Sequence, residues 1–395
     1  MKYNFDVLTD RRNSDSLKWD VAENELPMWV ADMDFRTAPG IIEAVQKRAA
    51  TGIYGYGIVP DRWYDAIISW WEGRHGIRFE KEWLSFCTGV VPAISSIVKR
   101  VTNLGDRVLV QTPVYDIFFH SIENAGRTVL ENKLLYDGES YRIDFDDLEK
   151  KLSQPLTTMM ILCNPHNPVG KIWTREELEK IGALCKKYGV TVLSDEIHCD
   201  LTDPGFSYTP FLSVSEDCRA NGIVCIAASK AFNLAGMQSA AVVVSDPLLR
   251  NKVVRGINSD EVAEPNCFAV ESTVAAFTLG GEWLDELRAY LCANKALVYD
   301  YLRQEIPGIK PLAQHATYLL WLDCSAIAED SDVLSAFLRS ETGLYVTAGT
   351  QYRGNGKQFL RMNVACPASR VRDGLARLKA GTDAFLREST CRRNR

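Results

Sequence analysis

The segment Val224-Cys-Ile-Ala-Ala-Ser-Lys-Ala-Phe-Asn-Leu-Ala-Gly236 decides the fold of this chain. Its first five residues are apolar and predict the end of a buried strand, and Lys230 follows after a single serine. Small residues and Gly236 come next, which lets another group approach the backbone closely. A flexible cation just beyond an apolar strand raises the question of what it meets at the edge of a sheet.

Similar apolar runs alternate with helical patterns from about residue 41 to residue 245. They predict strands at Trp83–Cys87, Arg107–Gln111, Met159–Cys163, Val190–Ser194, Ile223–Ala227 and Ala240–Val244. Strands that are apolar throughout are typical of a mostly parallel sheet covered on both faces. One intervening helix begins at Thr174-Arg-Glu-Glu177, a capping-box pattern. The alternation predicts an α/β fold, with a large domain whose mostly parallel sheet is sandwiched by helices.

Beyond about residue 285 the alternation changes. A long helical pattern precedes predicted strands at Thr317–Leu322 and Phe359–Val364, and a final helix follows. We expect residues 41–284 to form the large domain and residues 285–395 to form a smaller α+β domain. The irregular segment 1–40 is expected to join the small domain.

Composition limits the classes of partner. The 395 residues are 46% hydrophobic and 24% charged with a net charge of −6, which argues against nucleic acid or an anionic membrane as the main partner. The 11 cysteines include no C-x-x-C pair and no Cys/His ligand spacing, so the sequence predicts neither a metal site nor a disulfide framework. There is no apolar leader and no run long enough to span a membrane, and we expect a cytoplasmic protein with reduced thiols.

Polar and aromatic residues follow five of the predicted strands, at the edge where such sheets form binding sites. Thr88-Gly-Val-Val-Pro92 offers free N–H groups at a helix start, which favour a phosphate. Tyr115 offers a flat aromatic face. Asn164-Pro-His-Asn-Pro-Val-Gly170 forms a rigid loop that holds an amide and suits a cis peptide bond. Asp195-Glu-Ile-His198 offers a carboxylate, and Ser229-Lys230 offers an amine.

Each of these features has an ordinary explanation when taken singly: a turn, core packing, a helix cap, an ion pair or an exposed lysine. Together they match pyridoxal 5′-phosphate (PLP), which carries a phosphate, an aromatic ring, a phenolic oxygen, a pyridine nitrogen and an aldehyde. The glycine-rich fingerprints of dinucleotide and P-loop sites are absent, which disfavours a nicotinamide-dependent oxidoreductase.

The sequence resembles the fold-type-I PLP enzymes of the class I/II aminotransferase family, in particular the cystathionine β-lyase-like branch of MalY/PatB-type C–S lyases. The resemblance covers nearly the whole chain. Its most specific stretches are Pro27-Met-Trp-Val-Ala-Asp-Met-Asp-Phe35, Tyr54-Gly-Tyr-Gly57, Thr88-Gly-Val-Val-Pro92, Cys163-Asn-Pro-His-Asn-Pro-Val-Gly170, Ser194-Asp-Glu-Ile-His198 and Ser229-Lys-Ala-Phe-Asn-Leu-Ala-Gly236.

The resemblance implies a set of cofactor-binding residues. These are Val90, Val91, Tyr115, Asn167, Asp195, His198, Ser229 and Lys230, with Tyr56 reaching the phosphate of the neighbouring subunit. Three of them are also catalytic: Lys230 binds the cofactor's aldehyde and acts as a base, Asp195 pairs with the ring nitrogen, and Tyr115 stacks on the ring. The role of Tyr56 implies a homodimer.

Two further positions concern an amino-acid substrate. The resemblance implies that Arg361, in Phe359-Leu-Arg-Met-Asn363, binds the substrate α-carboxylate through a bidentate fork. Trp29 is a candidate to shape the substrate pocket, with packing as an equal explanation.

Four positions differ from patterns common in related enzymes. Ala227, His198 and Gln238 stand where aspartate aminotransferases have a serine, a tyrosine and a phosphate-binding arginine, and all three fit the lyase branch. Asp116 stands where many branch members have a second tyrosine after the stacking one. The difference at Asp116 leaves open which group protonates the leaving group.

The resemblance therefore implies a PLP-dependent C–S lyase that cleaves L-cystathionine or a related cysteine S-conjugate by α,β-elimination to a thiol, pyruvate and ammonia. A PLP-dependent aminotransferase is the main alternative, because the same residues serve both reactions. A PLP-binding regulatory protein without turnover is a third possibility, which the presence of Lys230, Asp195, Asn167 and Arg361 disfavours.

Overall fold

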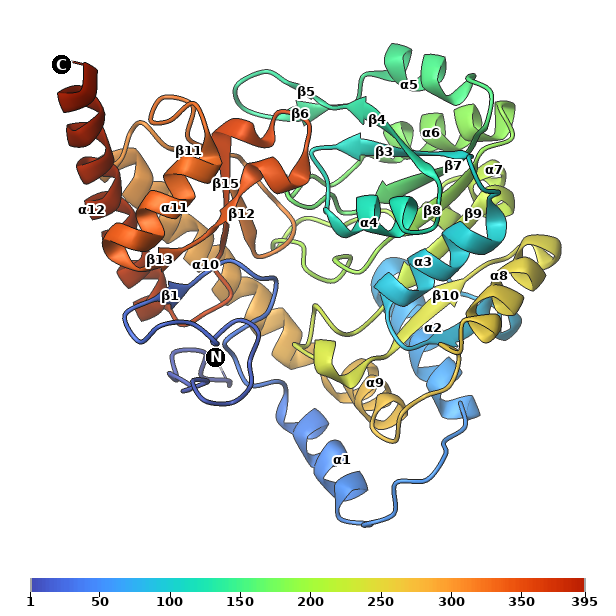
Figure 1. The fold of residues 1–395 in the computed structure, drawn as a ribbon. Coiled ribbons are helices and arrows are strands. Elements are labelled where there is room, and N and C mark those ends of the chain that lie inside the picture. Colours follow the sequence, from blue (N-terminus) through green and yellow to red (C-terminus); the bar gives the residue numbers. More distant parts are fainter. Residues whose placement is uncertain (1, 394–395) are drawn as a thin grey trace.

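The computed structural model describes residues 2–393 and contains two principal sheets. The larger sheet has seven strands, in the spatial order β2 (Leu84–Cys87), β10 (Ala240–Val243), β9 (Gly222–Ile226), β8 (Thr191–Asp195), β7 (Thr157–Cys163), β3 (Arg107–Thr112) and β4 (Thr128–Lys133). Strand β10 is antiparallel to both neighbours, and the remaining pairs are parallel. The predicted α/β fold with a mostly parallel sheet is confirmed (Figure 1).

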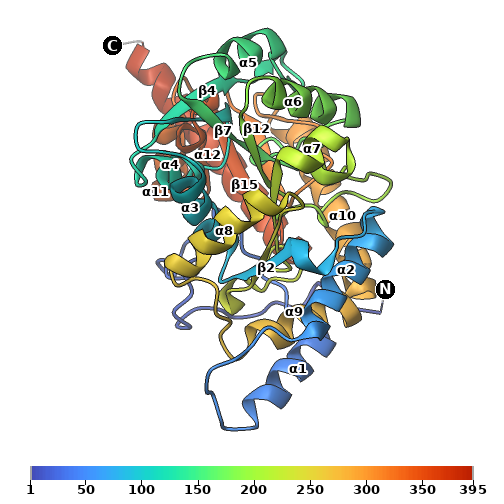
Figure 2. The same ribbon diagram turned by 90° about the vertical axis from the view of Figure 1, so that its right-hand side faces the viewer.

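Helices cover both faces of this sheet, so that its strands are buried on both sides. Figure 2 shows α3 and α8 on one side of the sheet and α6 and α7 on the other. The helices of this part of the chain are α1 (Pro39–Ala49), α2 (Asp61–His75), α3 (Val90–Val101), α4 (Ile117–Glu123), α5 (Phe145–Leu152), α6 (Arg175–Lys187), α7 (Glu216–Asn221), α8 (Pro247–Ser259) and α9 (Ala269–Leu279). Among residues 2–393, no helix is both long enough and apolar enough to cross a bilayer.

The predicted elements are present, with ends displaced by one or two residues. The capping box at the start of α6 is formed, since Thr174 Oγ1 accepts from the Glu177 N–H and Glu177 Oε2 from the Thr174 N–H. The strand predicted from Thr317 begins only at Leu319, because Thr317 has a φ of 64° and cannot continue an extended strand. Both Asn-Pro bonds of the 164–170 loop are cis.

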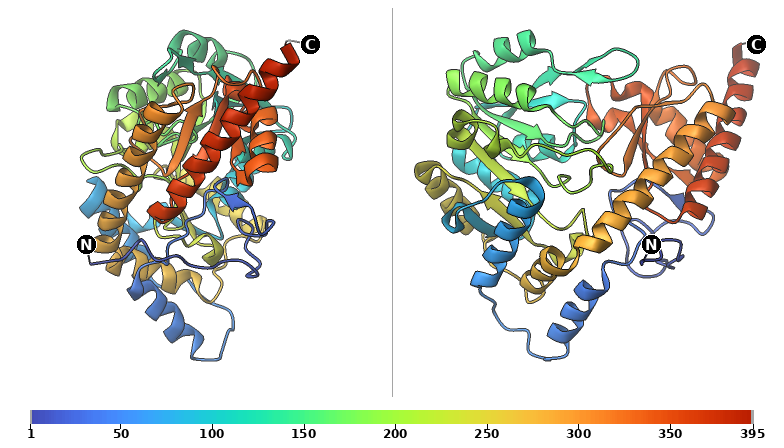
Figure 3. Two further views of the ribbon diagram at one scale, coloured as in Figure 1. Left: turned by 90° about the vertical axis from the view of Figure 1, so that its left-hand side faces the viewer. Right: turned by 180° about the vertical axis from the view of Figure 1, so that it is seen from behind.

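The smaller sheet has four strands and its own apolar core. Its order is β11 (Lys310–Pro311), β12 (Leu319–Asp323), β15 (Phe359–Asn363) and β14 (Thr347–Ala348). The core is completed by α10 (Gly281–Glu305), α11 (Ser331–Thr342) and α12 (Ala368–Arg393). Figure 3 shows α10 as one long helix that runs from α9 to the small sheet. The expected division after residue 284 falls in the first turn of α10.

The N-terminal segment packs on both parts of the chain. Its short strand β1 (Leu26–Pro27) pairs in parallel with β13 (Leu344–Tyr345). A separate antiparallel ribbon, outside this segment, is formed by β5 (Leu135–Tyr136) and β6 (Tyr141–Arg142) (Figure 1). The buried carboxylate of Asp34 accepts from Lys18 Nζ at 3.0 Å and from the indole N–H of Trp19 at 2.9 Å. It also pairs with Arg370 of α12 at 3.1 Å, which anchors the segment to the small part of the chain.

Replacing Asp34 by asparagine should lower the free energy of unfolding by about 3–5 kcal/mol, because buried Lys18 then loses its counter-charge. Burial opposes ionisation of Asp34, but Lys18, Trp19 and Arg370 outweigh it, so that the pKa of Asp34 is lowered. Urea unfolding of the variant measures the loss. Asp20→Asn, at an exposed position of the same segment, is the matched control and should leave the unfolding midpoint within error of the wild type.

Candidate active site

A cavity of about 270 Å³ opens at the carboxyl edge of the large sheet. Residues at the ends of β2, β3, β7, β8 and β9, or just beyond them, line it together: Gly89, Tyr115, Asn167, Asp195 and Lys230. A larger hollow of about 510 Å³ lies beside the N-terminal segment, but neither a lysine nor a histidine lines it. The structure therefore brings together the groups that the sequence places at five different strand ends.

Lys230 provides an amine with a weakened affinity for protons. Burial and the nearby charge of Arg361 lower the pKa of Lys230 to about 8, against the opposing effects of Asp32 and Asp195. Its Nζ donates a hydrogen bond to the backbone carbonyl of Ala31 at 2.8 Å. An amine with this pKa is partly neutral near physiological pH and can act as a nucleophile or a base.

Asp195 ends β8 as a buried carboxylate, and no cationic side chain of the described residues forms an ion pair with it. One of its oxygens accepts from the N–H of Ile197 at 3.1 Å, and burial raises the pKa of Asp195 to about 7. Such an acid is stabilised in its charged form only when a cation is placed beside it. Its position in the cavity therefore suits a ligand with a protonated ring nitrogen.

His198 lies on the same segment and is neutral. Burial, followed by the charges of Lys230 and Arg361, lowers the pKa of His198 to about 3. Its Nδ1 is buried and has no hydrogen-bond partner among the described residues. An unsatisfied ring nitrogen at this edge is available to a polar atom of a ligand.

The start of α3 forms the anion-binding end of the cavity. Helix α3 begins at Val90 after Gly89, and the first N–H groups of a helix have no partner within it. Ser229 and Gln238 line the same cavity. Helix N–H groups and the helix dipole favour a phosphate there. Among residues 2–393, no arginine is in the lining of this cavity.

Tyr115 and Asn167 form a pair on the side of β3 and β7. The N–H of Tyr115 donates to the carbonyl of Asn167 at 3.1 Å, which fixes the two loops together. The Tyr115 ring packs edge-on against Phe118, with centroids 5.7 Å apart. Burial raises the pKa of Tyr115 well above its usual value, so the phenol is protonated.

Arg361 comes from β15 of the small sheet and lies beside Asn167, next to the residues that line the cavity. It is buried, with Nη2 donating to the Trp29 carbonyl at 2.9 Å and Nη1 to Asn167 Oδ1 at 3.4 Å. Its guanidinium lies over the Tyr352 ring, 4.9 Å from the centroid. The buried Nε has no partner among the described residues. Arg361 is thus held in place while keeping donor capacity for a carboxylate.

Three of the predicted site residues are not in the lining of this cavity: Arg361, which contacts it through Asn167, Trp29 and Tyr56. The indole of Trp29 stacks on Tyr345, with centroids 4.9 Å and planes 12° apart, and only its carbonyl reaches the site through Arg361. Tyr56 lies in the loop between α1 and α2 and is fully exposed. Its placement is compatible with a contact to another chain.

Sequence reasoning missed the groups that hold the N-terminal segment over Lys230. Asn363, two residues after Arg361, donates to the carbonyls of Val30 and Asp32, each at 2.7 Å. Asn233, three residues after Lys230, donates to the Met33 carbonyl at 3.1 Å and accepts from the Met33 N–H at 3.2 Å. The pattern Arg-x-Asn in a buried strand was the available signal for Asn363.

The donor set of the cavity fits PLP. Helix N–H groups suit the phosphate, Asp195 suits a protonated ring nitrogen, and the unsatisfied His198 Nδ1 and Arg361 Nε are available to the cofactor and to a substrate carboxylate. Lys230 supplies an amine for the aldehyde. The sheet and this set of groups at its carboxyl edge define the class of fold-type-I PLP proteins.

Comparison with known proteins identifies the family. Residues 24–378 match the family described as aminotransferase class I and II, and the chain belongs to it. The chain is 42% identical over 383 residues to cystathionine β-lyase PatB of Bacillus subtilis (strain 168), covering 95% of this chain and 99% of that protein. Protein MalY of Escherichia coli (strain K12) is 30% identical, with 95% and 98% covered.

A solved structure of the same shape contains the cofactor. Cystalysin of Treponema denticola, crystallised with pyridoxal 5′-phosphate, superposes with a TM-score of 0.94 at 31% identity, covering 98% of this chain and 100% of that one. The family resemblance inferred from the sequence motifs, including its PatB and MalY branch, is confirmed.

Proposed function

We propose that this chain is a PLP-dependent carbon–sulfur lyase that cleaves L-cystathionine or a related cysteine S-conjugate by α,β-elimination. The observation that carries the proposal is the meeting of Lys230 and Asp195 in one cavity, with Arg361 held beside it by Asn167 and the Trp29 carbonyl. The cystathionine β-lyase PatB, similar along its whole length, supports a lyase over an aminotransferase.

Three side chains of the site have separate roles in the elimination reaction. Arg361 binds the substrate α-carboxylate and orients the Cα–H bond, and Asn167 steadies the guanidinium. Lys230 removes the Cα proton as a general base, which its lowered pKa favours. When bound, PLP supplies a ring that accepts the resulting negative charge. The Cβ–S bond then breaks and thiolate leaves, and hydrolysis of the remaining three-carbon fragment gives pyruvate and ammonia.

The test is incubation of the PLP-loaded protein with L-cystathionine in the absence of any oxo acid. We expect equal amounts of pyruvate and homocysteine. Turnover that depends strictly on an added oxo acid would identify an aminotransferase instead. PLP binding without either reaction would identify a protein without turnover.

Replacing Arg361 by lysine should lower kcat/KM for L-cystathionine roughly 10- to 150-fold, the equivalent of one lost charge-assisted hydrogen bond of about 1.5–3 kcal/mol. An ammonium cannot form the planar fork that grips a carboxylate. Initial rates measured across a range of substrate concentrations check the effect. Arg339→Lys, which replaces a guanidinium paired with Glu25 outside the cavity, is the control and should keep the wild-type value.

We also infer that two copies of the chain form a homodimer in which Tyr56 binds the partner's cofactor phosphate. The loop that carries Tyr56 exposes the apolar side chains of Ile53, Tyr54 and Ile58, which need cover in solution. The absence of an arginine from the phosphate end of the cavity leaves room for a donor from outside the chain.

We further infer a cytoplasmic location, because all 11 cysteines are free.

Tyr56→Phe should weaken PLP binding roughly tenfold or more while leaving the dimer intact, because only a hydrogen bond to a charged phosphate is lost. Dialysis against PLP measures the affinity, and sedimentation measures the mass. Tyr54→Phe, whose hydroxyl donates to the Ala49 carbonyl of its own chain, is the control. A monomeric wild-type protein, or unchanged PLP affinity in the Tyr56 variant, would contradict the shared site.

A further inference from the structure

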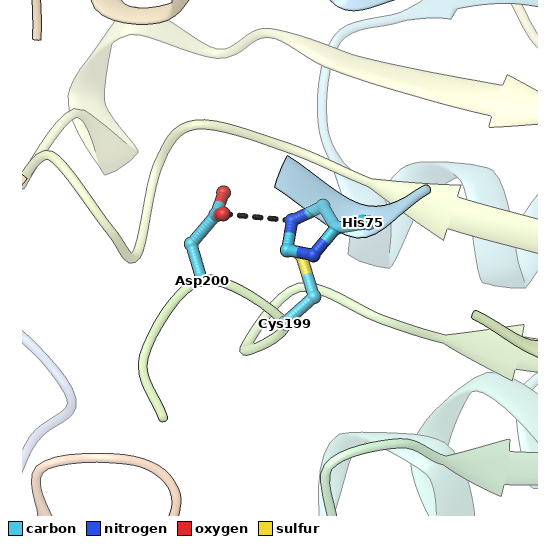
Figure 4. Close-up of side chains that lie close together, drawn as sticks. All are labelled: His75, Cys199 and Asp200. Atoms are coloured by element: carbon cyan, nitrogen blue, oxygen red, sulfur yellow. Dashed lines mark hydrogen bonds and ion pairs between the residues drawn. The ribbon is translucent and has the colours of Figure 1, made fainter. Parts of the chain in front are cut away.

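Three metal-ligating side chains converge outside the PLP cavity, between the end of α2 and the turn that follows β8. They are His75, Cys199 and Asp200, and one ligand atom from each lies within 4.8 Å of the others (Figure 4). His75 Nε2 and Asp200 Oδ1 are 2.9 Å apart. None of the three lines the PLP cavity, and the described activity uses none of them.

The surroundings hold these side chains in position. The indole N–H of Trp70 donates to both oxygens of Asp200, at 3.1 Å each. The Tyr208 ring packs edge-on against the His75 ring, with centroids 4.8 Å apart. Cys199 and Asp200 are buried, and the His75 side chain is 10% exposed. A ligand set whose carboxylate is oriented by a further hydrogen bond is the usual construction of a metal site.

Space and charge also suit a bound cation. The three residues line a small cavity of about 70 Å³, which has room for an ion and a water molecule. Arg74 and Arg288 line the same cavity, but both form ion pairs with Asp285. Arg288 also donates to the Thr202 carbonyl at 2.7 Å. Their positive charges are therefore directed to other partners.

We propose that Cys199 Sγ, a His75 ring nitrogen and an Asp200 oxygen bind one zinc ion, with the fourth position open to water from the cavity. A thiolate, an imidazole and a carboxylate together select zinc or cobalt rather than magnesium or calcium. Binding of the ion releases the Cys199 thiol proton to solvent. The two negative charges of the thiolate and Asp200 then balance the charge of the divalent ion.

Such an ion would link two segments that are far apart in the chain. His75 is the last residue of α2 and lies 125 residues before Asp200, so no short ligand spacing exists in the sequence. Cys199 directly follows His198 of the PLP cavity. The ion would therefore hold the turn after β8, which carries His198 of the cofactor site, against the end of helix α2.

The test uses the PLP-loaded protein carrying Cys391→Ser, which removes the exposed thiol most able to bind zinc by chance. Equilibrium dialysis against Zn²⁺ should give one ion per chain, and the thermal midpoint should rise with zinc. Co²⁺ should give a sulfur-to-metal charge-transfer band. In this background, Cys199→Ser and His75→Gln should each abolish the stoichiometric ion, the zinc-dependent midpoint shift and the cobalt band.

Two further variants test whether Trp70 orients a zinc ligand and whether zinc binding is specific to Cys199. Trp70→Phe should weaken zinc binding roughly 10- to 100-fold, because it removes the indole N–H that orients both oxygens of Asp200 and keeps an aromatic ring in the core. Cys292→Ser, at a half-buried cysteine elsewhere, should bind zinc like its parent. His75 lies at a helix end, so His75→Gln tests the site even if a buried Cys199 variant folds poorly. No uptake by the parent, or equal uptake by His75→Gln, would overturn the proposal and show adventitious binding only.

Discussion

Lys230→Ala is expected to lower kcat for L-cystathionine cleavage by about 10⁴-fold or more, the largest effect of any single substitution in this chain. The variant loses both the amine that joins the cofactor's aldehyde and the base that removes the Cα proton. The variant should also lose the visible absorption of the covalently attached cofactor after gel filtration. Pyruvate formation and absorption spectra of the two proteins measure the two effects separately.

The control for this substitution is Lys252→Ala, at an exposed lysine of α8, which should keep wild-type activity and spectrum. Because the Lys230 ammonium is buried at a cost, its removal should not destabilise the cofactor-free fold. A Lys230 variant that still turns over at more than a small fraction of the wild-type rate would refute the assignment of the base. An added primary amine that partly restores the rate would support it.

The elements around the site could be predicted from the sequence because strands buried on both faces carry an unmistakable apolar signal. All five residues of β9 and the last five of β7 are buried, and both were predicted within two residues. Strand β4 was missed, since Thr128–Lys133 lies at the sheet edge and mixes exposed polar residues with half-buried ones. Strand β4 therefore lacks the continuous apolar run on which the prediction depends, whereas β2, at the other edge, keeps one.

The residues at the strand ends could also be predicted, because the carboxyl ends of parallel strands meet at one edge. The contacts from distant segments could not. The Ala31 carbonyl that accepts from Lys230 is a backbone group, and no side-chain pattern marks it. Likewise, nothing local shows that the Trp29 indole turns toward Tyr345 while its carbonyl turns toward Arg361. Such contacts depend on how the N-terminal segment packs, and Asp34 and Asn363 hold that segment through contacts between residues far apart in the sequence.

Because Asp195 is buried in the PLP cavity, its substitution should have the second large effect on kcat. Asp195→Asn should lower kcat roughly 10²- to 10³-fold while PLP remains bound, because a neutral amide cannot hold the ring nitrogen in its protonated, electron-accepting state. The amide oxygen can still accept from the Ile197 N–H, so the local backbone is kept. Because burial works against a charged Asp195, the substitution should also leave the cofactor-free protein at least as stable as the wild type.

Three measurements separate this role from a structural one. The variant should bind PLP with a visible spectrum, keep a KM near that of the wild type and lose activity in kcat. Asp195→Glu, which keeps the charge but displaces it, should retain more activity than the asparagine variant. Asp217→Asn, at an exposed position of α7 outside the cavity, is the matched control and should keep the wild-type kcat with L-cystathionine. Equal kcat values for Asp195→Asn and the wild type would show that the buried acid does not act on the ring. The proposed pairing of Asp195 with the protonated ring nitrogen of PLP would then be refuted.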